Sequence, residues 1–265
     1  MLDFHVARHS SGREHVVDKQ TLEHFRQFGW VLIRGFYDPK GIRELTASVE
    51  QMTQLPEVSG RQMVYREQSL LDPSQRVIQR IEDFCPHHAG LDAEVRRGQL
   101  CDAVSHLIGE PAVLFKDKVN FKMPGGAGFE AHQDQQAGWS RYAPYFVTAM
   151  VTIDAATLEN GCLEMPSVPR AEALIGREWE PLTAEDLKGF ELIPVPTSPG
   201  DVAFFDSYVP HASKANLTSQ QRRVLYVTYN RAGDGDHRAQ YYDDKRKSFP
   251  PDIDRAPGEE YRFRV

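Results

Sequence analysis

The sequence predicts a mainly β fold with flanking helices, a double-stranded β-helix or cupin-like jelly roll, formed as one domain over residues 1–265. Short alternating runs rich in β-branched and aromatic residues are separated by glycine and proline turns, a pattern typical of jelly rolls. The clearest helical patterns are N-terminal, so helices are expected to flank the sheets. A length of 265 residues also suits a single β-barrel-like domain.

The first two helices have clear boundaries. Residues 18–29 carry apolar side chains at helical spacing and end at a glycine, which predicts a short amphipathic helix. Residues 30–34 follow as a strand. Asp38 and Pro39 provide a capping side chain and a first-turn proline, so a second helix is expected to run to about Gln54. Both helices, within residues 18–55, should pack on the barrel.

The next segments differ in how clearly they are patterned. Residues 56–73 have no period and predict a surface loop, or part of a lid that carries Tyr65 and Arg66. Residues 76–84 alternate as a strand that contains Arg80. Residues 91–109 show apolar residues at helical spacing and end at a glycine, which predicts one continuous helix.

Residues 112–123 predict a strand with two different faces. Phe115, Val119 and Phe121 make one face apolar. The opposite face is polar and carries Lys116, Lys118, Asn120 and Lys122. Lysines on a strand are usually solvated, so this face is either an exposed edge or, because the strand leads directly to His132, the wall of an internal cavity.

Residues 135–145 predict a loop that is rich in aromatic residues. It is either a packed loop over the barrel mouth or a wall of a substrate site. In the second case a ring of Trp139, Tyr142 or Tyr145 would pack on an ammonium group of the substrate.

The following strands are short. Residues 146–154 predict a buried strand, and Asn160-Gly161 within residues 159–164 predicts a β-hairpin turn. Thr183 and Asp186 form a capping box for a short helix that ends near Gly189. Residues 191–195 are then expected to be a strand.

The charged tail, residues 235–265, has two open interpretations. Disorder is the default for such a composition, whereas its aromatic residues, such as Tyr241 and Phe249, could pack against the barrel.

The composition excludes several classes of function. A formal charge of −7 and a pI near 5.8 predict no general attraction to nucleic acid or to anionic membranes. No apolar run approaches the roughly 20 residues of a membrane span, and residues 1–16 lack the apolar core of a secretory signal. The expected compartment is the cytoplasm. The three cysteines are widely spaced, which indicates reduced thiols.

A zinc cluster is a rival metal site. Its members would be Cys85, His87, His88, Cys101 and His106. The last two are five residues apart, which does not place them on one helical face, and structural zinc sites have tighter pairs. A polar loop beside an ordinary helix is the favoured interpretation.

A stronger candidate lies at the end of residues 125–134. Two residues apart on a strand, His132 and Asp134 project from the same face, and one further imidazole completes a three-ligand site for ferrous iron. One His-x-Asp triplet can occur by chance. The stretch 199–213 supports the site because it leads through an apolar strand to His211. Eleven residues later, Arg222 begins a buried strand, where it could pair with a carboxylate beside the metal.

These two stretches and their order resemble the phytanoyl-CoA hydroxylase (PhyH-like) family of iron(II)- and 2-oxoglutarate-dependent dioxygenases, from about Phe25 to about Asp234. His211, Ser213 and Arg222 match three family positions in register. Residues 159–164 also share the resemblance. Residues 80–84, residues 116–122 and the glycine run before His132 look similar to the bacterial branch that hydroxylates 2-aminoethylphosphonate and its trimethylammonium analogue.

The resemblance implies a role for each site residue. His132, Asp134 and His211 would hold iron(II), leaving positions for O2 and for 2-oxoglutarate as cosubstrate. The residues expected to contact 2-oxoglutarate are Arg222, Ser213, Asn120, Lys118, Met150 and Arg80. Arg80 could equally reach the substrate.

The implied substrate is a small polar or anionic molecule, with an aminoethylphosphonate as one candidate. The basic residues Arg66, Arg80, Lys116, Lys122 and Arg141 outnumber those that one 2-oxoglutarate needs. The candidate substrate residues are Tyr65, Arg66, Gln135, Trp139 and Arg141. No nucleic-acid or membrane partner is expected, and the oligomeric state stays open.

Two other functions stay open, a hydroxylase of another small metabolite or natural-product intermediate and a metal-binding barrel without oxygenase activity. Most relatives continue with proline, glycine, serine and histidine where this sequence has Pro166 followed by Ser167, Val168 and Pro169, so it departs from the family on the substrate side. Asp134 favours hydroxylation over halogenation. Arg222 together with Ser213 argues against an inactive barrel.

Overall fold

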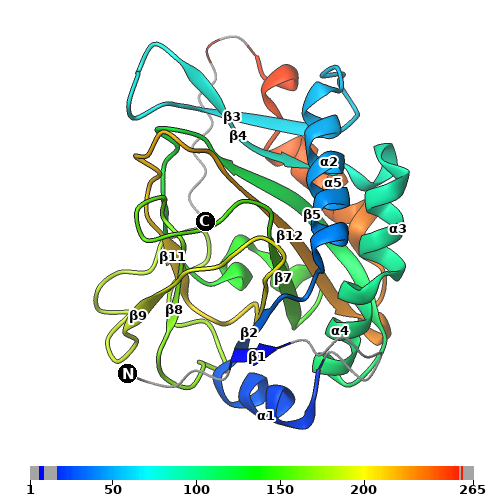
Figure 1. The fold of residues 1–265 in the computed structure, drawn as a ribbon, viewed down its shortest axis with the longest axis vertical. Helices are drawn as coiled ribbons and strands as arrows, with labels where there is room; N and C mark the ends of the chain where they lie inside the picture. Colours follow the sequence, from blue (N-terminus) through cyan, green and yellow to red (C-terminus); the bar gives the residue numbers. More distant parts are fainter. Residues whose placement is uncertain (1–5, 9–16, 257, 259–265) are drawn as a thin grey trace.

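The computed structural model describes residues 6–8, 17–256 and 258, and consists of two β-sheets flanked by helices (Figure 1). The larger sheet has the strand order β1-β2-β10-β7-β12-β5-β4-β3, and the smaller sheet has the order β6-β11-β8-β9. All strand pairs are antiparallel except β1 with β2. This arrangement confirms the predicted jelly roll.

The strands and helices have the following bounds. The larger sheet contains β1 (Val6–Arg8), β2 (Trp30–Arg34), β3 (Met63–Gln68), β4 (Arg76–Glu82), β5 (Ala112–Lys122), β7 (Phe146–Thr152), β10 (Val202–Asp206) and β12 (Arg222–Arg231). The smaller sheet contains β6 (Phe129–His132), β8 (Leu163–Pro166), β9 (Leu192–Val195) and β11 (His211–Ser213). The helices are α1 (Lys19–Phe28), α2 (Pro39–Gln54), α3 (Ala89–Arg97), α4 (Gln99–Ile108) and α5 (Arg238–Ser248).

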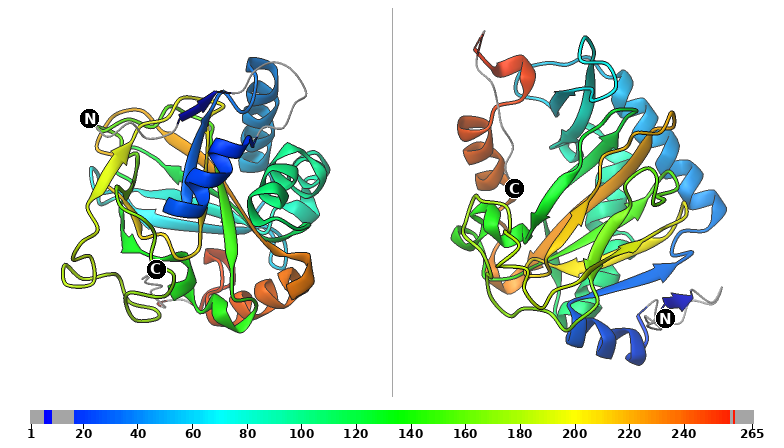
Figure 2. Two further views of the ribbon diagram at one scale, coloured as in Figure 1. Left: turned by 90° about the horizontal axis from the view of Figure 1, so that it is seen from below. Right: turned by 90° about the vertical axis from the view of Figure 1, so that its left-hand side faces the viewer.

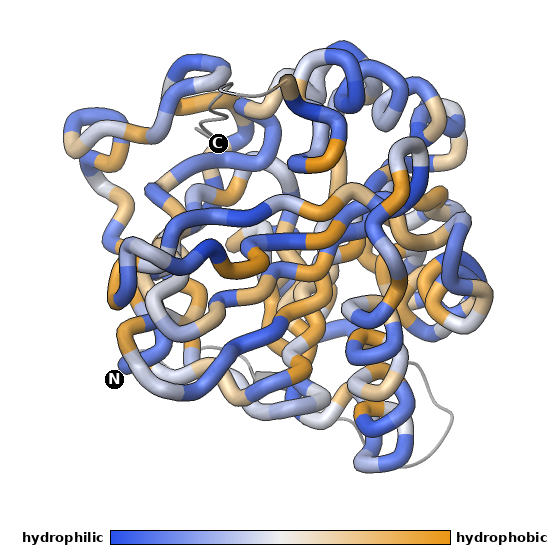
Figure 3. Tube along the Cα trace, turned by 90° about the horizontal axis from the view of Figure 1, so that it is seen from above, coloured by the Kyte–Doolittle hydropathy of each residue, from blue (hydrophilic) through white to orange (hydrophobic). Residues whose placement is uncertain are grey.

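The larger sheet is covered on both faces. Helices α2, α3 and α4 lie on its outer face, and the smaller sheet lies across its inner face (Figure 1, Figure 2). Successive side chains of β2 point to opposite faces of this sheet. Val31 and Ile33 belong to the core under the helices. Trp30 and Leu32 belong to the core between the two sheets. Apolar residues accordingly concentrate along the central strands (Figure 3).

The two N-terminal helices begin and end as predicted. Asp18 caps α1 by accepting a hydrogen bond from the backbone N–H of Thr21 at 2.7 Å, and Gly29 ends it with a φ of 75°. Asp38 caps α2 in the same way, accepting from the N–H of Gly41 at 2.6 Å. Side-chain capping and a left-handed glycine are local signals, which explains why the sequence predicts these boundaries well.

The predicted helix over residues 91–109 is wrong in one respect, because Gly98 divides it into α3 and α4. Gly98 has extended backbone, with φ −89° and ψ −176°. A Cβ atom there would lie 2.2 Å from the carbonyl oxygen of Glu94, so only glycine allows the chain to turn at this point.

The prediction of a loop over residues 56–73 is also corrected, since Met63–Gln68 form the edge strand β3. The first three residues of β3 are all buried and the last three are polar. A register shift between Tyr65 and Arg66 interrupts the pairing with β4. The strand therefore lacks the alternation by which strands are recognised.

Two predictions between β7 and β9 fail. The Asn160-Gly161 turn forms, with Gly161 at φ 74°, but it does not make a hairpin because β7 and β8 lie in different sheets. Thr183 and Asp186 exchange the predicted capping hydrogen bonds. The residues that follow form only turns, and a helix this short is marginal without packing.

One residue of β5 lies on the opposite face from that predicted. Strand β12 pairs Thr228 with Lys116 and Tyr229 with Leu114, so Phe115 is the extra residue of a β-bulge. Its ring packs on Trp139 and Phe146, on the inner side of the sheet, instead of with Val119.

The described part of the tail is ordered, which favours the second of its two interpretations. Residues 238–248 form α5, and Tyr241 and Tyr242 are buried. Arg238 donates to Asp83 and Asp117, and the Tyr242 hydroxyl donates to the carbonyl oxygen of Asp117 at 2.9 Å. Residues 259–265 lie outside the described residues.

Candidate metal centre and substrate cavity

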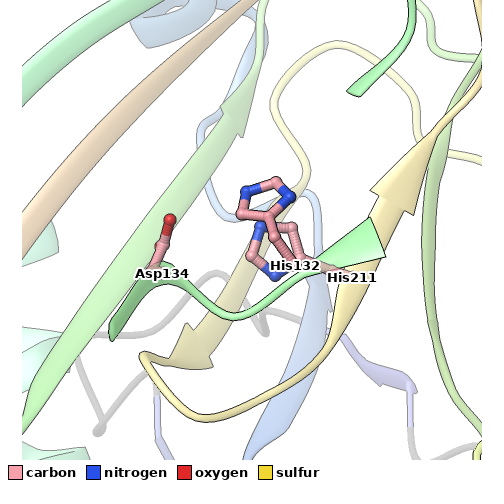
Figure 4. A group of neighbouring side chains, drawn as sticks. All are labelled: His132, Asp134 and His211. Atoms are coloured by element: carbon pink, nitrogen blue, oxygen red, sulfur yellow. The ribbon is translucent and has the colours of Figure 1, made fainter. Parts of the chain in front are cut away.

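Two strands of the smaller sheet bring three possible metal ligands together (Figure 4). His132 ends β6 and is the register partner of His211, which begins β11. Asp134 follows two residues after His132. One ligand atom from each residue lies within 4.8 Å of the others, and the two imidazole centroids are 4.4 Å apart.

Backbone carbonyl groups orient both imidazoles. Nδ1 of His132 lies 2.7 Å from the carbonyl oxygen of Glu130, and Nδ1 of His211 lies 3.0 Å from that of Val209. A carbonyl oxygen can only accept, so each Nδ1 carries the proton and each Nε2 keeps its lone pair for a metal.

The electrostatics suit a divalent cation. Burial, followed by the neighbouring His211, lowers the pKa of His132 to about 3, and burial also lowers the pKa of His211. Burial alone would raise the pKa of Asp134, but the two imidazoles and Lys118 outweigh it and the pKa is lowered. The result is two neutral imidazoles and one carboxylate, the donor set of a non-haem ferrous site.

These three residues lie in a cavity of about 430 Å³, a size typical of small-molecule sites. The residues that line this cavity, called the cavity below, include Lys116, Lys118, Asn120, Phe129, Trp139, Arg141, Tyr142, Thr148, Trp179, Ser213, Tyr226, Thr228, Tyr241, Asp244, Lys245 and Phe249. Lys116, Lys118 and Asn120 therefore face the cavity, as the second interpretation of that strand predicted, whereas Lys122, the fourth residue of the predicted face, is not in the lining.

A buried guanidinium with two unpartnered nitrogens lies next to Tyr226 of the cavity lining. Arg222 begins β12 and is only 2% exposed, yet its Nε and Nη1 have no hydrogen-bond partner among the described residues. Its register partner is Lys122, whose Nζ donates to Ser213 Oγ at 2.8 Å. Buried donors without acceptors are costly, so this group fits the carboxylate of a bound ligand.

Among the other residues predicted to contact the cosubstrate, Lys118 and Asn120 line the cavity, but Met150 and Arg80 do not. Met150 is buried in the core between the sheets. Arg80 is 1% exposed and donates from Nε to Glu82 at 2.7 Å, while its guanidinium lies 4.0 Å from the ring centroid of Tyr65. Arg80 therefore has a structural role between Glu82 and Tyr65, and it is not in a position to contact a molecule in the cavity.

The predicted substrate residues divide in the same way. Trp139 and Arg141 line the cavity. Gln135 is fully buried and donates to Ser140 and Ala143, so it shapes the loop instead. Neither Tyr65 nor Arg66 lines the cavity. Tyr65 donates at 2.7 Å to the carbonyl oxygen of Phe249, a lining residue, and Arg66 forms an ion pair with Glu57.

Two glutamines near Asp134, Gln133 and Gln136, hold the segment that contains Trp179. Gln133 donates to the carbonyl oxygen of Ala173 at 3.0 Å, and Gln136 donates to that of Arg177 at 2.6 Å. This segment places Trp179 in the cavity lining with a φ of 65°, a conformation that bulky residues rarely adopt. Trp179 was not predicted, and no local sequence signal indicates it.

The sequence reasoning also missed the contribution of α5. Tyr241, Asp244, Lys245 and Ser248 line the cavity and are spaced as i, i+3, i+4 and i+7, so they form one face of the helix. The spacing was visible in the sequence. Because two of the four side chains are charged, however, it did not resemble a buried face.

The rival zinc cluster does not assemble. Within residues 17–256, His132, Asp134 and His211 form the one group of three or more possible metal ligands. In the same described part, no helix is both long enough and apolar enough to cross a membrane.

Comparisons with known proteins agree with this geometry. The sequence profile of the phytanoyl-CoA dioxygenase (PhyH) family matches residues 25–224. A 2-aminoethylphosphonate dioxygenase from the uncultured bacterium HF130_AEPn_1 is 38% identical over 88% of this chain and 89% of its own length. A methylphosphonate hydroxylase from Gimesia maris is 36% identical over 91% of both chains. The solved structure of the epimerase SnoN, in complex with Fe3+ and alpha ketoglutarate, has a similar fold, with a TM-score of 0.66 at 20% identity over 93% of this chain and 94% of that one.

Proposed function

We propose, because this chain belongs to the phytanoyl-CoA dioxygenase (PhyH) family, that it hydroxylates a small phosphonate of the 2-aminoethylphosphonate type. As a family member it is an iron(II)- and 2-oxoglutarate-dependent dioxygenase that acts on a small molecule. The observation that carries the proposed substrate is the cavity, in which the possible metal ligands lie beside the lysines of β5. An anionic substrate would use this positive wall.

In this proposal His132, Asp134 and His211 hold iron(II) through two imidazole Nε2 atoms and one carboxylate oxygen. When bound, iron and 2-oxoglutarate supply the oxidation of an unactivated C–H bond by O2, with succinate and carbon dioxide as co-products. The protein fixes the ligands: the carbonyl groups of Glu130 and Val209 orient the two rings, and the Thr148 hydroxyl donates to Asp134 at 3.2 Å.

Arg222 and Ser213 are proposed to bind the carboxylate of 2-oxoglutarate that is remote from the metal. This assignment rests on the two buried guanidinium nitrogens of Arg222 that lack partners, Nε and Nη1, and on Ser213 in the cavity lining. Lys122 would add a third donor, because its Nζ already contacts Ser213 Oγ. Asn120 and Lys118 are proposed to lie along the bound molecule, since both line the cavity.

The test is a succinate-release assay on the iron-loaded protein, with product identified by mass spectrometry. 2-Aminoethylphosphonate, its trimethylammonium analogue, methylphosphonate and a fatty acyl-CoA are compared at equal concentration. We expect stoichiometric succinate and a product heavier by one oxygen with the first compound. Methylphosphonate is the rival substrate because of the 36% identical relative. Coupled turnover with none of the phosphonates would reject the proposed substrate class.

The cytoplasm remains the proposed compartment, supported by the three cysteines, which are free thiols in the structure. Cell fractionation tests it. That residues 1–265 fold as one domain also stays a prediction, for which limited proteolysis is the direct measurement.

A further inference from the structure

We infer that the cavity binds a zwitterion in one orientation, with Lys116 on β5 holding its anionic end and Asp244 on α5 holding its ammonium end. The inference rests on the proposed function and deepens it. It predicts why 2-aminoethylphosphonate should be preferred over methylphosphonate, which has no ammonium group.

Lys116 is a buried cation that faces aromatic rings. Its side chain is 7% exposed, and Nζ lies 5.1 Å from the ring centroid of Trp139 and 5.8 Å from that of Tyr241. Trp139 is in turn fixed by edge contacts with Phe115 and Phe146. Ring faces hold an ammonium group in place but do not neutralise it.

The acidic groups nearest to Lys116 are already engaged. Glu82 accepts from Arg80 at 2.7 Å and from Lys245 at 2.6 Å, so two cations share that carboxylate. Asp134 belongs to the proposed metal site. Within the described residues, Lys116 forms no ion pair of its own.

A formal count of charge shows what the cavity lacks. Iron(II) and Arg222 together cancel the two carboxylates of 2-oxoglutarate and that of Asp134. Glu82 offsets only one of Arg80 and Lys245. Lys116 and the neighbouring Lys118 therefore have no carboxylate of their own after the cosubstrate binds, and Asp244 is the further carboxylate of the cavity lining. A buried charge without a partner is unfavourable. A phosphonate would supply the missing negative charge, at a place bordered by Lys118 and the metal site.

Asp244 provides a carboxylate at a less buried part of the same cavity. It lies one helical turn after Tyr241, on the face of α5 that lines the cavity, and accepts a hydrogen bond from the Tyr142 hydroxyl at 2.8 Å. The rings of Trp179 and Phe249, which are 5.6 Å apart, line the cavity as well. A carboxylate with ring faces nearby is the chemistry that recognises an ammonium group.

The two ends are within reach of one small molecule. Tyr241 contacts the Lys116 ammonium, and Asp244 follows Tyr241 on the same helix face, where residues three apart have Cβ atoms about 5–6 Å from each other. A phosphonate and an ammonium joined by two carbons match this arrangement. The adjacent Asp243 is exposed and does not line the cavity, so it offers a matched control.

The experiment is an anaerobic titration of the iron(II) and 2-oxoglutarate complex, in which the visible absorption band reports ligand entry. The probes are 2-aminoethylphosphonate and methylphosphonate. The variants are Lys116→Met, Lys116→Arg, Asp244→Asn and the control Asp243→Asn. Lys116→Met keeps an unbranched side chain between the rings, and Asp244→Asn keeps an acceptor for Tyr142.

We expect Lys116→Met to weaken the binding of both phosphonates by about 10- to 150-fold, the effect of losing one charge-assisted hydrogen bond. Lys116→Arg should restore part of that loss. Asp244→Asn should weaken the binding of 2-aminoethylphosphonate by about 10-fold and leave the binding of methylphosphonate unchanged. Asp243→Asn should change neither. An unchanged dissociation constant for 2-oxoglutarate, measured in the same titrations, shows that each variant is folded.

Failure of the inference and failure of the proposed function give different results. If the wild-type protein releases succinate with a phosphonate but Lys116→Met binds it normally, the inference is wrong and the proposed function stands. If Asp244→Asn weakens the binding of both phosphonates, or of neither, the assignment of the ammonium end is overturned. If the wild-type complex binds both probes with the expected pattern but forms no product, the anion site stands and the substrate proposal fails. Absence of binding in the wild-type protein overturns both.

Discussion

His132 and His211 are register partners across the antiparallel pair β6 and β11, so a single strand pairing sets the distance between the two imidazoles. The rings lie 4.4 Å apart, and each is fixed through Nδ1 by a carbonyl group of its own chain segment. The proposed iron site is therefore built by backbone pairing as much as by the ligands themselves.

Loss of one imidazole should abolish tight iron binding. We predict that His211→Ala lowers iron(II) affinity by more than the 10- to 100-fold that the loss of an outer-shell partner costs. Metal analysis after anaerobic loading measures it. His106→Ala, an exposed histidine on α4, is the control and should bind iron normally. Full iron occupancy in His211→Ala would contradict the assignment of this ligand.

Arg222→Ala should weaken the binding of 2-oxoglutarate and leave iron binding unchanged. A charge-assisted pair is worth about 1.5–3 kcal/mol, so the dissociation constant should rise about 10- to 150-fold. The neighbouring Arg223 is a matched control, because its guanidinium binds Asp154 at 2.7 Å on the other side of the sheet. Arg223→Ala should lower the melting temperature while 2-oxoglutarate binds normally. Equal effects of both variants on binding would reject the role of Arg222.

The affinity for 2-oxoglutarate should depend on pH through Lys122. Burial, followed by Arg222, lowers the pKa of Lys122 to about 6, so this amine is mostly neutral at pH 7.5 before the ligand binds. A carboxylate beside Ser213 would favour the charged form and raise that pKa, so binding takes up a proton. The dissociation constant should then increase as the pH rises above about 6, by at most tenfold per pH unit.

Calorimetry in buffers of different ionisation enthalpy measures this proton directly. The Lys122→Met variant should take up a smaller fraction of a proton when 2-oxoglutarate binds. Its affinity for 2-oxoglutarate should also vary less with pH. A binding enthalpy that is independent of buffer in the wild-type protein would contradict the prediction.

The ion pairs of Glu82 should hold α5 against the larger sheet. Glu82 lies on β4 and joins Arg80 to Lys245 of the helix, and all three side chains are buried. Glu82→Ala leaves two buried cations without their carboxylate, which costs about 3–5 kcal/mol. Urea unfolding measures the loss, and faster proteolysis within residues 238–248 would show that the helix has detached. Wild-type stability in Glu82→Ala would contradict this role.

The part of the fold that the sequence predicts rests on local signals. Asp18, Asp38 and Gly29 mark helix ends through contacts within a few residues. The predicted strand ends at His132, and Asp134 begins a 3-10 turn, but Gln133 between them keeps the extended backbone on which the predicted spacing depends. The part it does not predict depends on distant pairing. Whether β7 and β8 share a sheet, for example, cannot be inferred from the Asn160-Gly161 turn that joins them.

The candidate site shows the same division. The roles of Arg222 and Ser213 are implied by the family resemblance, which matches both in register with His211, and the structure places Ser213 in the cavity lining and Arg222 next to Tyr226 of that lining. Trp179 and α5 were missed because they reach the cavity from segments without regular apolar periodicity. In α5, buried positions are occupied by Arg238 and Lys245, which ordinary hydropathy patterns assign to the surface.

The C-terminal helix has one consequence for how this protein could diversify. The proposed iron and cosubstrate residues come from the two sheets and the turn after β6, whereas Asp244 comes from α5, which follows the last strand of the described residues. In the proposed binding mode, the ammonium end of the substrate is thus recognised by a segment separate from the oxidising centre, whereas the anionic end is held by Lys116 of the sheet. A change confined to α5 would then alter which cationic group is accepted and leave the oxidising centre intact.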